Sequence, residues 1–438
     1  MNNKLTVGVI SLGCDKNRVD TEKMLAFLQP EYNLTSTIEN ADIIIINTCA
    51  FLESSRKEAI EEIFGACSLK QSNPNLKVVV TGCLPQKFID EIFDEMFEVD
   101  GFLGISDYDK IVSVLKRVTQ GERVNCVGSC RGECSKKRVL TTNGYAYLKI
   151  SDGCNNHCTY CLIPKIRGAY RSVDQEFLIE EAKGLGRVEE LILVAQDTTQ
   201  YGVDLTPKTT LTQLIKNLSK LDSICRIRLL YCYPENITDE LILEIKNNPK
   251  VIKYIDIPLQ HADDRVLKLM NRKGTGAGYL DLINKLKQTI PEIAIRSTFI
   301  TGFPGEDQTA FENLINFLQQ AKLFNAGFFA YSREQDTPAY KLVNQVEEKV
   351  KKQRLKKLYS CQKKIVKQNF KQFIGKTIQV FAEGFDQDTF TYYGRAYFNA
   401  PQVDGKVYFF SSEQVDYGKT YQVKIIKSED YDLYGERL

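Results

Sequence analysis

Three cysteines lie within eight residues of one another, in the pattern Cys154-x3-Cys158-x2-Cys161, here called the first triplet. Soft thiolate ligands suit iron–sulfur clusters. A [4Fe–4S] cluster has four irons, so three cysteines leave one iron without a protein ligand, where chemistry can take place. The alternative is zinc, which usually takes four ligands in paired C-x2-4-C spacing. Because only His157 is at hand as a fourth ligand, the pattern favours an iron–sulfur site with a catalytic role.

A second set of three cysteines, Cys14, Cys49 and Cys83 (the second triplet), is widely spaced, but each cysteine follows a β-branched apolar run. Helical patterns separate these runs, and the resulting βαβαβ order predicts a parallel sheet covered on both faces. Functional groups of such sheets gather beyond the carboxyl ends of the strands. Gly13 and Gly82 precede two of the cysteines and let the backbone turn tightly there. We expect a second thiolate site; the alternative is that each cysteine is a small core residue.

The two triplets and the segments SLGCDKNRVDTE, NTCAFLESS and VTGCLPQ resemble the radical S-adenosylmethionine (SAM) methylthiotransferases over nearly the whole chain. The resemblance implies two [4Fe–4S] clusters, one at each triplet. At the first, catalytic triplet, SAM chelates the open iron, and Tyr160 is expected beside its adenine. One departure from the family pattern is Asp15, where proline is expected.

Six strand-like runs with helical segments between them extend over about 145–331 and suit an open (β/α)6 barrel, as in the SAM family. The first triplet follows the first of these strands, on the carboxyl rim where barrel active sites lie. Other rim segments make Gln196, Asp197, His261 and Arg296 candidates to line the SAM and substrate cavity. The alternative is that each is structural, with His261 bonded to a backbone group and Arg296 paired with a carboxylate.

The last third of the chain begins with a long helical pattern at 346–372, which carries ten Lys/Arg and no acid from Lys349 to Lys371. A solvated linker and a nucleic-acid contact are both compatible with it. The alternating runs after it predict a small antiparallel β-barrel, and GRAYFNAPQVDG and DYDLYGERL resemble a TRAM domain. Seven Lys/Arg against ten Asp/Glu in 373–438 favour a basic protein partner over RNA.

The predicted fold class is α/β, with five segments. They are an N-terminal parallel α/β sandwich (4–120), a linker (121–139), an open (β/α)6 radical SAM barrel (140–345), a basic linker helix (346–372) and a TRAM-like β-barrel (373–438). The linker contains Cys126, Cys130 and Cys134, whose role the sequence leaves open. Packing positions are expected for the remaining four cysteines, Cys67, Cys225, Cys232 and Cys361.

Composition places the chain among ordinary globular proteins, with 43% hydrophobic residues and a formal charge of +2 over 438 residues. This charge gives no general case for binding nucleic acid or membranes. The sequence shows no signal-peptide pattern and no apolar run of the roughly 20 residues that a membrane span needs. We therefore expect a cytoplasmic, monomeric protein with reduced thiols.

SLGCDKN, VAQDTTQYG and IPLQH resemble the family branch that modifies an aspartate of small-subunit ribosomal protein twelve. The reaction implied is replacement of an unactivated C–H at the β-carbon by C–SCH3, supported by an external electron donor and a sulfur source. The first alternative is methylthio transfer to isopentenyl-adenosine in tRNA. A second is a non-catalytic iron–sulfur carrier or RNA-binding protein.

Overall fold

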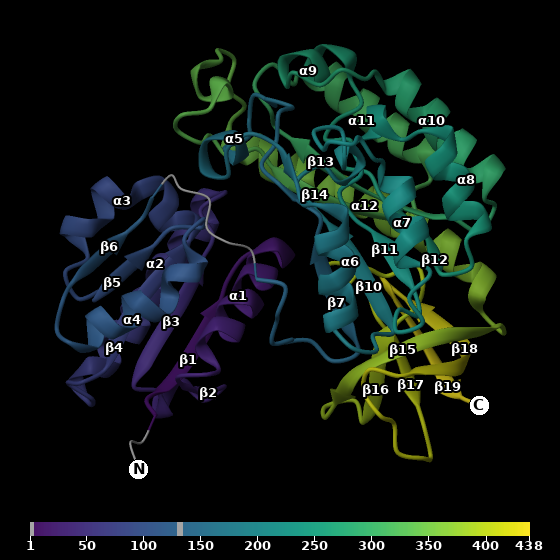
Figure 1. The fold of residues 1–438 in the computed structure, drawn as a ribbon. Helices are drawn as coiled ribbons and strands as arrows, with labels where there is room; N and C mark the ends of the chain where they lie inside the picture. Colours follow the sequence, from purple (N-terminus) through teal and green to yellow (C-terminus); the bar gives the residue numbers. More distant parts are fainter. Residues whose placement is uncertain (1–3, 129–134) are drawn as a thin grey trace. The chain divides into compact units, whose positions relative to one another are not determined.

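The computed structural model describes residues 4–128 and 135–438 (Figure 1). The chain forms two compact units. Unit 1 contains Met1–Thr141, Tyr147–Asn156 and Cys161–Gly186, and unit 2 contains Thr142–Ala146, His157–Tyr160 and Arg187–Leu438. Two of the linker cysteines, Cys130 and Cys134, lie outside the described residues. No helix in the two described stretches combines the length and apolarity needed to cross a bilayer.

Unit 1 is built on a six-stranded parallel sheet in the order β2-β1-β3-β4-β5-β6. Its strands are β1 (Thr6–Ser11), β2 (Asn33–Thr35), β3 (Ile43–Thr48), β4 (Lys77–Gly82), β5 (Gly101–Leu103) and β6 (Val124–Cys126). The connecting helices are α1 (Asp15–Leu28), α2 (Glu53–Ser68), α3 (Cys83–Glu95) and α4 (Ile111–Thr119). Alternate residues of β3 enter two separate apolar clusters, Ile44 and Ile46 in one and Ile43 and Ile45 in the other. The predicted parallel sheet with two covered faces is therefore confirmed.

Unit 1 also holds the segment around the first triplet. Two short antiparallel strands, β8 (Ser151–Asp152) and β9 (Arg171–Ser172), bracket it, and the helices α5 (Ile163–Ile166) and α6 (Gln175–Gly184) follow the cysteines. The predicted boundary at residue 140 does not coincide with the division into compact units, because 147–156 and 161–186 pack with unit 1.

The second sheet has six strands in the order β14-β13-β12-β11-β10-β7, and β7 and β14 form its two edges. Its strands are β7 (Tyr145–Lys149), β10 (Glu190–Val194), β11 (Ile227–Leu229), β12 (Val251–Asp256), β13 (Ala294–Thr301) and β14 (Asn325–Ala330). Its helices are α7 (Leu211–Leu218), α8 (Asp239–Asn247), α9 (Asp264–Leu269), α10 (Gly276–Thr289) and α11 (Gln308–Ala321). All six predicted strands are confirmed, in an open sheet.

The basic segment forms one long helix, α12 (Glu348–Phe370). Its apolar stripe buries Leu358, Ile365, Val366 and Phe370, whereas Leu355 is only half-buried. After it, β15 (Thr377–Asp386), β16 (Thr391–Arg395), β17 (Val407–Phe410), β18 (Thr420–Glu429) and β19 (Asp432–Arg437) close into a barrel. The predicted barrel is confirmed, but the expectation that it is wholly antiparallel is wrong, since β17 pairs with β19 in parallel. Five strands cannot alternate in direction around a closed ring, so at least one pairing must be parallel.

Within unit 2, the C-terminal barrel packs against the amino ends of the parallel strands (Figure 1). Arg395 of β16 pairs with Glu190, the first residue of β10. Asn325, the first residue of β14, donates from its amide nitrogen to the carbonyl oxygen of Phe398 at 2.8 Å. The C-terminal barrel thus covers one end of the sheet, and the carboxyl ends of the strands lie at the other.

Candidate iron–sulfur centres

The second triplet lies beyond the carboxyl ends of three neighbouring strands of unit 1. Cys14 directly precedes α1, which follows β1; Cys49 directly follows β3; and Cys83, directly after β4, is the first residue of α3. Because β1, β3 and β4 are consecutive in the sheet, cysteines far apart in the sequence meet at one edge. Parallel topology makes this edge the usual place for a binding site.

Two glycines hold the backbone of this edge in conformations that other residues rarely adopt. Gly13 has a φ of 86°, and a Cβ there would lie 2.7 Å from Cys49 Cβ. Gly82 has a φ of 98°, and a Cβ there would lie 2.4 Å from Asn47 Oδ1 and 2.5 Å from the carbonyl oxygen of Thr48. Both positions are left-handed as well as crowded, so glycine is required for the cysteines to approach one another.

Burial keeps the Cys49 and Cys83 thiols protonated. Loss of water raises the pKa of Cys83 to about 12, against the lowering effect of Arg167, and burial also raises the pKa of Cys49. Without a metal both stay neutral thiols, since coordination is what removes such a proton. Across the part of the chain that the structure describes, no three His, Cys, Asp or Glu side chains form a site for a metal ion. Zinc usually takes four protein ligands, whereas a [4Fe–4S] cluster bound by three cysteines keeps one iron without a protein ligand.

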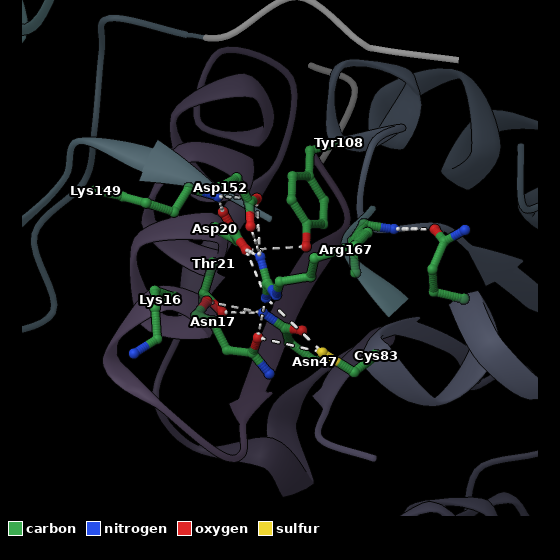
Figure 2. Close-up of polar contacts among 12 residues, drawn as sticks. Lys16, Asn17, Asp20, Thr21, Asn47, Cys83, Tyr108, Lys149, Asp152 and Arg167 are labelled. Carbon is green, nitrogen blue, oxygen red and sulfur yellow. Dashed lines mark hydrogen bonds and ion pairs between the residues drawn. The ribbon is translucent and has the colours of Figure 1, made fainter. Parts of the chain in front are cut away.

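A polar network in unit 1 centres on the Arg167 guanidinium and reaches Cys83 at its edge (Figure 2). Arg167, just after α5, is only 3% exposed, and its Nη2 donates to Asn17 Oδ1 at 2.6 Å. Its Nη1 donates to the carboxylate of Asp152 at 3.0 Å, and both terminal nitrogens lie 3.3 Å from Asp20 Oδ2. Nη2 also donates to Cys83 Sγ at 3.8 Å.

The first triplet lies in the segment between β8 and β9. Gly153, directly after β8, has a φ of 77°, and a Cβ there would lie 2.2 Å from a carbonyl oxygen of the chain returning to β9. The backbone N–H of Asn156 donates to Cys154 Sγ at 3.5 Å, and that of Ile163 donates to Cys161 Sγ at 3.4 Å. Hydrogen bonds to sulfur favour the thiolate, the form that binds iron.

Cys158 belongs to 157–160, the short part of this segment that packs in unit 2. There the backbone N–H of Thr159 donates to the carbonyl oxygen of Met270 at 3.1 Å, and its hydroxyl donates to that of Leu269 at 2.8 Å. These bonds attach the middle cysteine to the turn that ends α9.

Arg272 is a candidate functional residue that the sequence analysis missed. It is 7% exposed, its Nη1 lies 4.0 Å from Cys158 Sγ, and its Nη2 donates to the carbonyl oxygen of Pro258 at 2.7 Å. Its guanidinium carbon lies 4.1 Å from the centre of the Tyr233 ring. Among the described residues, the groups that act on the charge of Arg272 are Cys158 and tyrosines rather than carboxylates, and its Nε has no hydrogen-bond partner. A buried cation of this kind calls for an anion beside it.

Three of the predicted SAM contacts lie at the carboxyl rim of the second sheet. Gln196 and Asp197 follow β10, and the Asp197 carboxylate accepts from the backbone N–H and the hydroxyl of Thr199 at 3.2 and 2.7 Å. Tyr160 is half-buried, and its ring meets that of Phe303, just beyond β13, edge to face with centroids 6.4 Å apart. A contact of each with SAM stays a prediction.

The other two predicted contacts lie in positions that give such a role no support. His261 is fully buried; its Nδ1 accepts from the backbone N–H of Asp263 at 3.0 Å, and its Nε2 lies 3.3 Å from Glu306 Oε2, so both ring nitrogens are occupied. Arg296 is the third residue of β13, towards the amino end. It pairs with Asp256 at 3.0 Å and with Asp404 of the C-terminal barrel at 3.1 Å. The expectation that Arg296 lies on the carboxyl rim is therefore wrong, because the strand starts only two residues before it.

Comparison with known proteins agrees with this architecture. The radical SAM superfamily model matches 148–318, a model described as uncharacterized protein family UPF0004 matches 6–104, and a TRAM domain model matches 374–438. The chain is 46% identical over 447 residues to the ribosomal protein uS12 methylthiotransferase RimO of Clostridium botulinum, covering 99% of this chain and 98% of that protein. It is 44% identical to RimO of Acetivibrio thermocellus, with the same coverage. The chain belongs to the RimO family.

Two solved structures resemble the fold of this RimO-family chain. The radical SAM methyltransferase TsrM of Kitasatospora setae gives a TM-score of 0.57 over 77% of each chain, at 12% identity. The cobalamin-dependent SAM radical enzyme OxsB gives a TM-score of 0.52 over 84% of this chain and 61% of its own, at 13% identity. At such identities the likeness concerns the fold alone.

Membership of the RimO family makes the chain a radical SAM methylthiotransferase and implies [4Fe–4S] and SAM as its cofactors. The residues present fit these groups. The first triplet has backbone N–H groups directed at two of its sulfurs, and the second lies in a cradle that a Cβ at Gly13 or Gly82 would fill.

Proposed function

We propose that this chain replaces a hydrogen at the β-carbon of an aspartate in ribosomal protein uS12 by a methylthio group, with one [4Fe–4S] cluster at each triplet. The observation that carries the proposal is the similarity over nearly the full length to relatives named for this substrate, in a chain that has both triplets. The position of the second triplet at the carboxyl edge of a parallel sheet supports it further.

When bound, the clusters and SAM supply the one-electron chemistry and the sulfur and methyl groups, which side chains alone cannot provide. The first triplet supplies three thiolates and so leaves one position of its cluster open to SAM. The positively charged guanidinium group of Arg272 lies beside Cys158, where it offsets the negative charge of the thiolates. Tyr160, Gln196 and Asp197 remain the side chains expected to orient SAM at the carboxyl rim.

Charge on the C-terminal barrel supports a basic protein as the substrate. Residues 373–438 carry seven Lys/Arg and ten Asp/Glu, and such an acidic surface attracts a basic protein and repels RNA phosphates. Transfer to tRNA is therefore the less favoured alternative.

Anaerobically reconstituted chain, given SAM and dithionite, should be incubated separately with uS12 and with tRNA that carries isopentenyl-adenosine. We expect methylthiolated uS12 by peptide mass spectrometry, together with 5′-deoxyadenosine. Cys158→Ala should abolish both products, whereas Cys361→Ala, on α12 and outside both triplets, should preserve them. Methylthio transfer to tRNA alone would refute the substrate, and absence of 5′-deoxyadenosine would refute the radical mechanism.

A further inference from the structure

Arg167 connects the segment of the first triplet to the second. It follows Cys161 by six residues, yet its guanidinium group lies among side chains of α1 and next to Cys83 (Figure 2). Nη2 donates to Asn17 Oδ1, and this amide oxygen lies 3.8 Å from Cys83 Sγ. The guanidinium group is thus held in place from several sides, with one nitrogen directed at a cysteine of the other triplet.

The charges around Arg167 balance before any thiolate is counted. Lys149 contacts Asp20 and lies 3.2 Å from Asp152, and Arg167 contacts the same two aspartates. Two cations, the buried Arg167 and the half-buried Lys149, therefore face two anions, the buried Asp20 and the half-buried Asp152. A cluster bound through Cys83 adds negative charge, and Arg167 is the cation that directs an N–H at the Cys83 sulfur.

We propose that Arg167 is a positioning residue for the second site, and that its N–H···S contact with Cys83 makes the cluster held there easier to reduce. This inference rests on the proposed function, because it requires an iron–sulfur cluster at the second triplet. Reduction adds an electron to a buried group, and a fixed cation and a hydrogen bond to sulfur both stabilise the added charge. Loss of Arg167 leaves Asp20 and Asp152 with Lys149 alone, so the same cluster is reduced at a lower potential.

The test uses the full chain with Cys154, Cys158 and Cys161 all replaced by alanine, so that only the second site can hold a cluster. Iron and sulfide are quantified first, and the cluster is then titrated with dithionite and redox mediators and followed by electron paramagnetic resonance. Arg167→Gln is compared with Arg138→Gln. Arg138 is another arginine of unit 1 whose side chain is as buried as that of Arg167, and it pairs with Glu22 and Glu181 rather than with a cysteine.

At the potential where the parent cluster is half reduced, we expect Arg167→Gln to shift the ratio of reduced to oxidised cluster at least tenfold towards oxidised, about 59 mV for one electron. Arg138→Gln should leave it unchanged, and Arg167→Lys should recover part of the shift. A ratio in Arg167→Gln within twofold of the parent overturns the inference. If the parent holds no cluster, the proposed function fails instead.

Two further measurements keep the inference testable if Arg167→Gln does not load a cluster. Asp152→Asn removes an anion from the same network and should shift the ratio towards reduced cluster; no shift, or the opposite one, overturns the inference. In chain labelled with 15N-arginine, the reduced cluster of the parent should show a nitrogen coupling by pulsed electron paramagnetic resonance. The nitrogen coupling should persist in Arg138→Gln. If the parent shows no nitrogen coupling, Arg167 does not contact Cys83 and the inference is overturned.

Discussion

Replacing Glu190 by glutamine should loosen the C-terminal barrel from the second sheet. The Glu190 carboxylate is buried between two guanidinium groups: Arg228 Nε donates to Oε1 at 2.6 Å, and Arg395 Nη1 donates to the two oxygens at 3.1 and 3.2 Å. Arg228 also donates to the carbonyl oxygen of Tyr397 at 2.8 Å. Arg395 and Tyr397 belong to the C-terminal barrel domain, so one carboxylate joins the two parts of unit 2.

The pKa of Glu190 gives the size of the effect. Burial alone raises this pKa, but Arg228 and Arg395 outweigh it and lower the pKa from 4.5 to about 2. The difference corresponds to about 3 kcal/mol of stability, within the roughly 3–5 kcal/mol expected when one partner of a buried pair is removed. Because the folded pKa is depressed, this contribution is fully present above about pH 4.5 and is lost as the pH falls towards 2.

Hydrogen exchange followed by mass spectrometry measures this loss locally. At pH 7 we expect amides of β16 and of 396–400 to exchange about 100-fold faster in Glu190→Gln, from about 3 kcal/mol at 1.36 kcal/mol per tenfold. The control is Glu189→Gln, since Glu189 is more exposed and its pairs with Arg187 and Arg226 are 3.5 and 4.0 Å long; it should change stability by less than about 0.5 kcal/mol. Equal exchange in both variants would refute the reasoning.

Three other predictions concern the two sites. Gly82→Ala should lower both the unfolding temperature and the amount of iron bound at the second triplet, because the added Cβ would lie 2.4 Å from Asn47 Oδ1. The control is Gly65→Ala, whose Cβ would have no atom within 4 Å. This substitution should stabilise α2 by about 0.5–1 kcal/mol. Arg272→Gln should slow 5′-deoxyadenosine formation about 100-fold. The control is Arg265→Gln, which changes an exposed side chain and should leave this rate unchanged. Equal rates of 5′-deoxyadenosine formation in the two variants would contradict a role for the buried Arg272. Cys83→Ala should keep 5′-deoxyadenosine formation and lose methylthiolated product; product formation there would exclude the second triplet as the sulfur site.

Much of the fold could be predicted because the signals are local. Apolar β-branched runs separated by helical patterns predict parallel strands, and parallel topology alone carries Cys14, Cys49 and Cys83 to one edge. The tight Cys154–Cys161 spacing needs no tertiary information to indicate a cluster. The segment DYDLYGERL indicated a TRAM-like motif but no strand, because acidic residues and glycine are uncommon in strands; it contains β19, which closes the barrel through a parallel pairing with β17.

The remaining site residues could not be predicted because their roles depend on long-range contacts. Nothing in the sequence around Arg167 or Arg272 indicates its partner, and only the fold brings each to a cysteine. Arg296 shows the reverse error. The strand β13 runs towards the carboxyl rim, but Arg296 lies near its start. The Arg296 side chain therefore forms ion pairs with Asp256 and Asp404.

The shared carboxylate of Glu190 also limits how this architecture can acquire new substrates. Replacing the C-terminal barrel by a barrel from another protein would leave Glu190 and Arg228 without Arg395. Only a replacement barrel with an arginine at the matching position would avoid this loss. Such a chimaera would keep the pair of Glu190 with Arg228 but lose the hydrogen bonds from Arg395 to the buried carboxylate, a loss of about 1.5–3 kcal/mol for a hydrogen bond to a charged group. Retargeting is therefore easier by changing the solvent-facing loops of the existing module than by exchanging the whole of it.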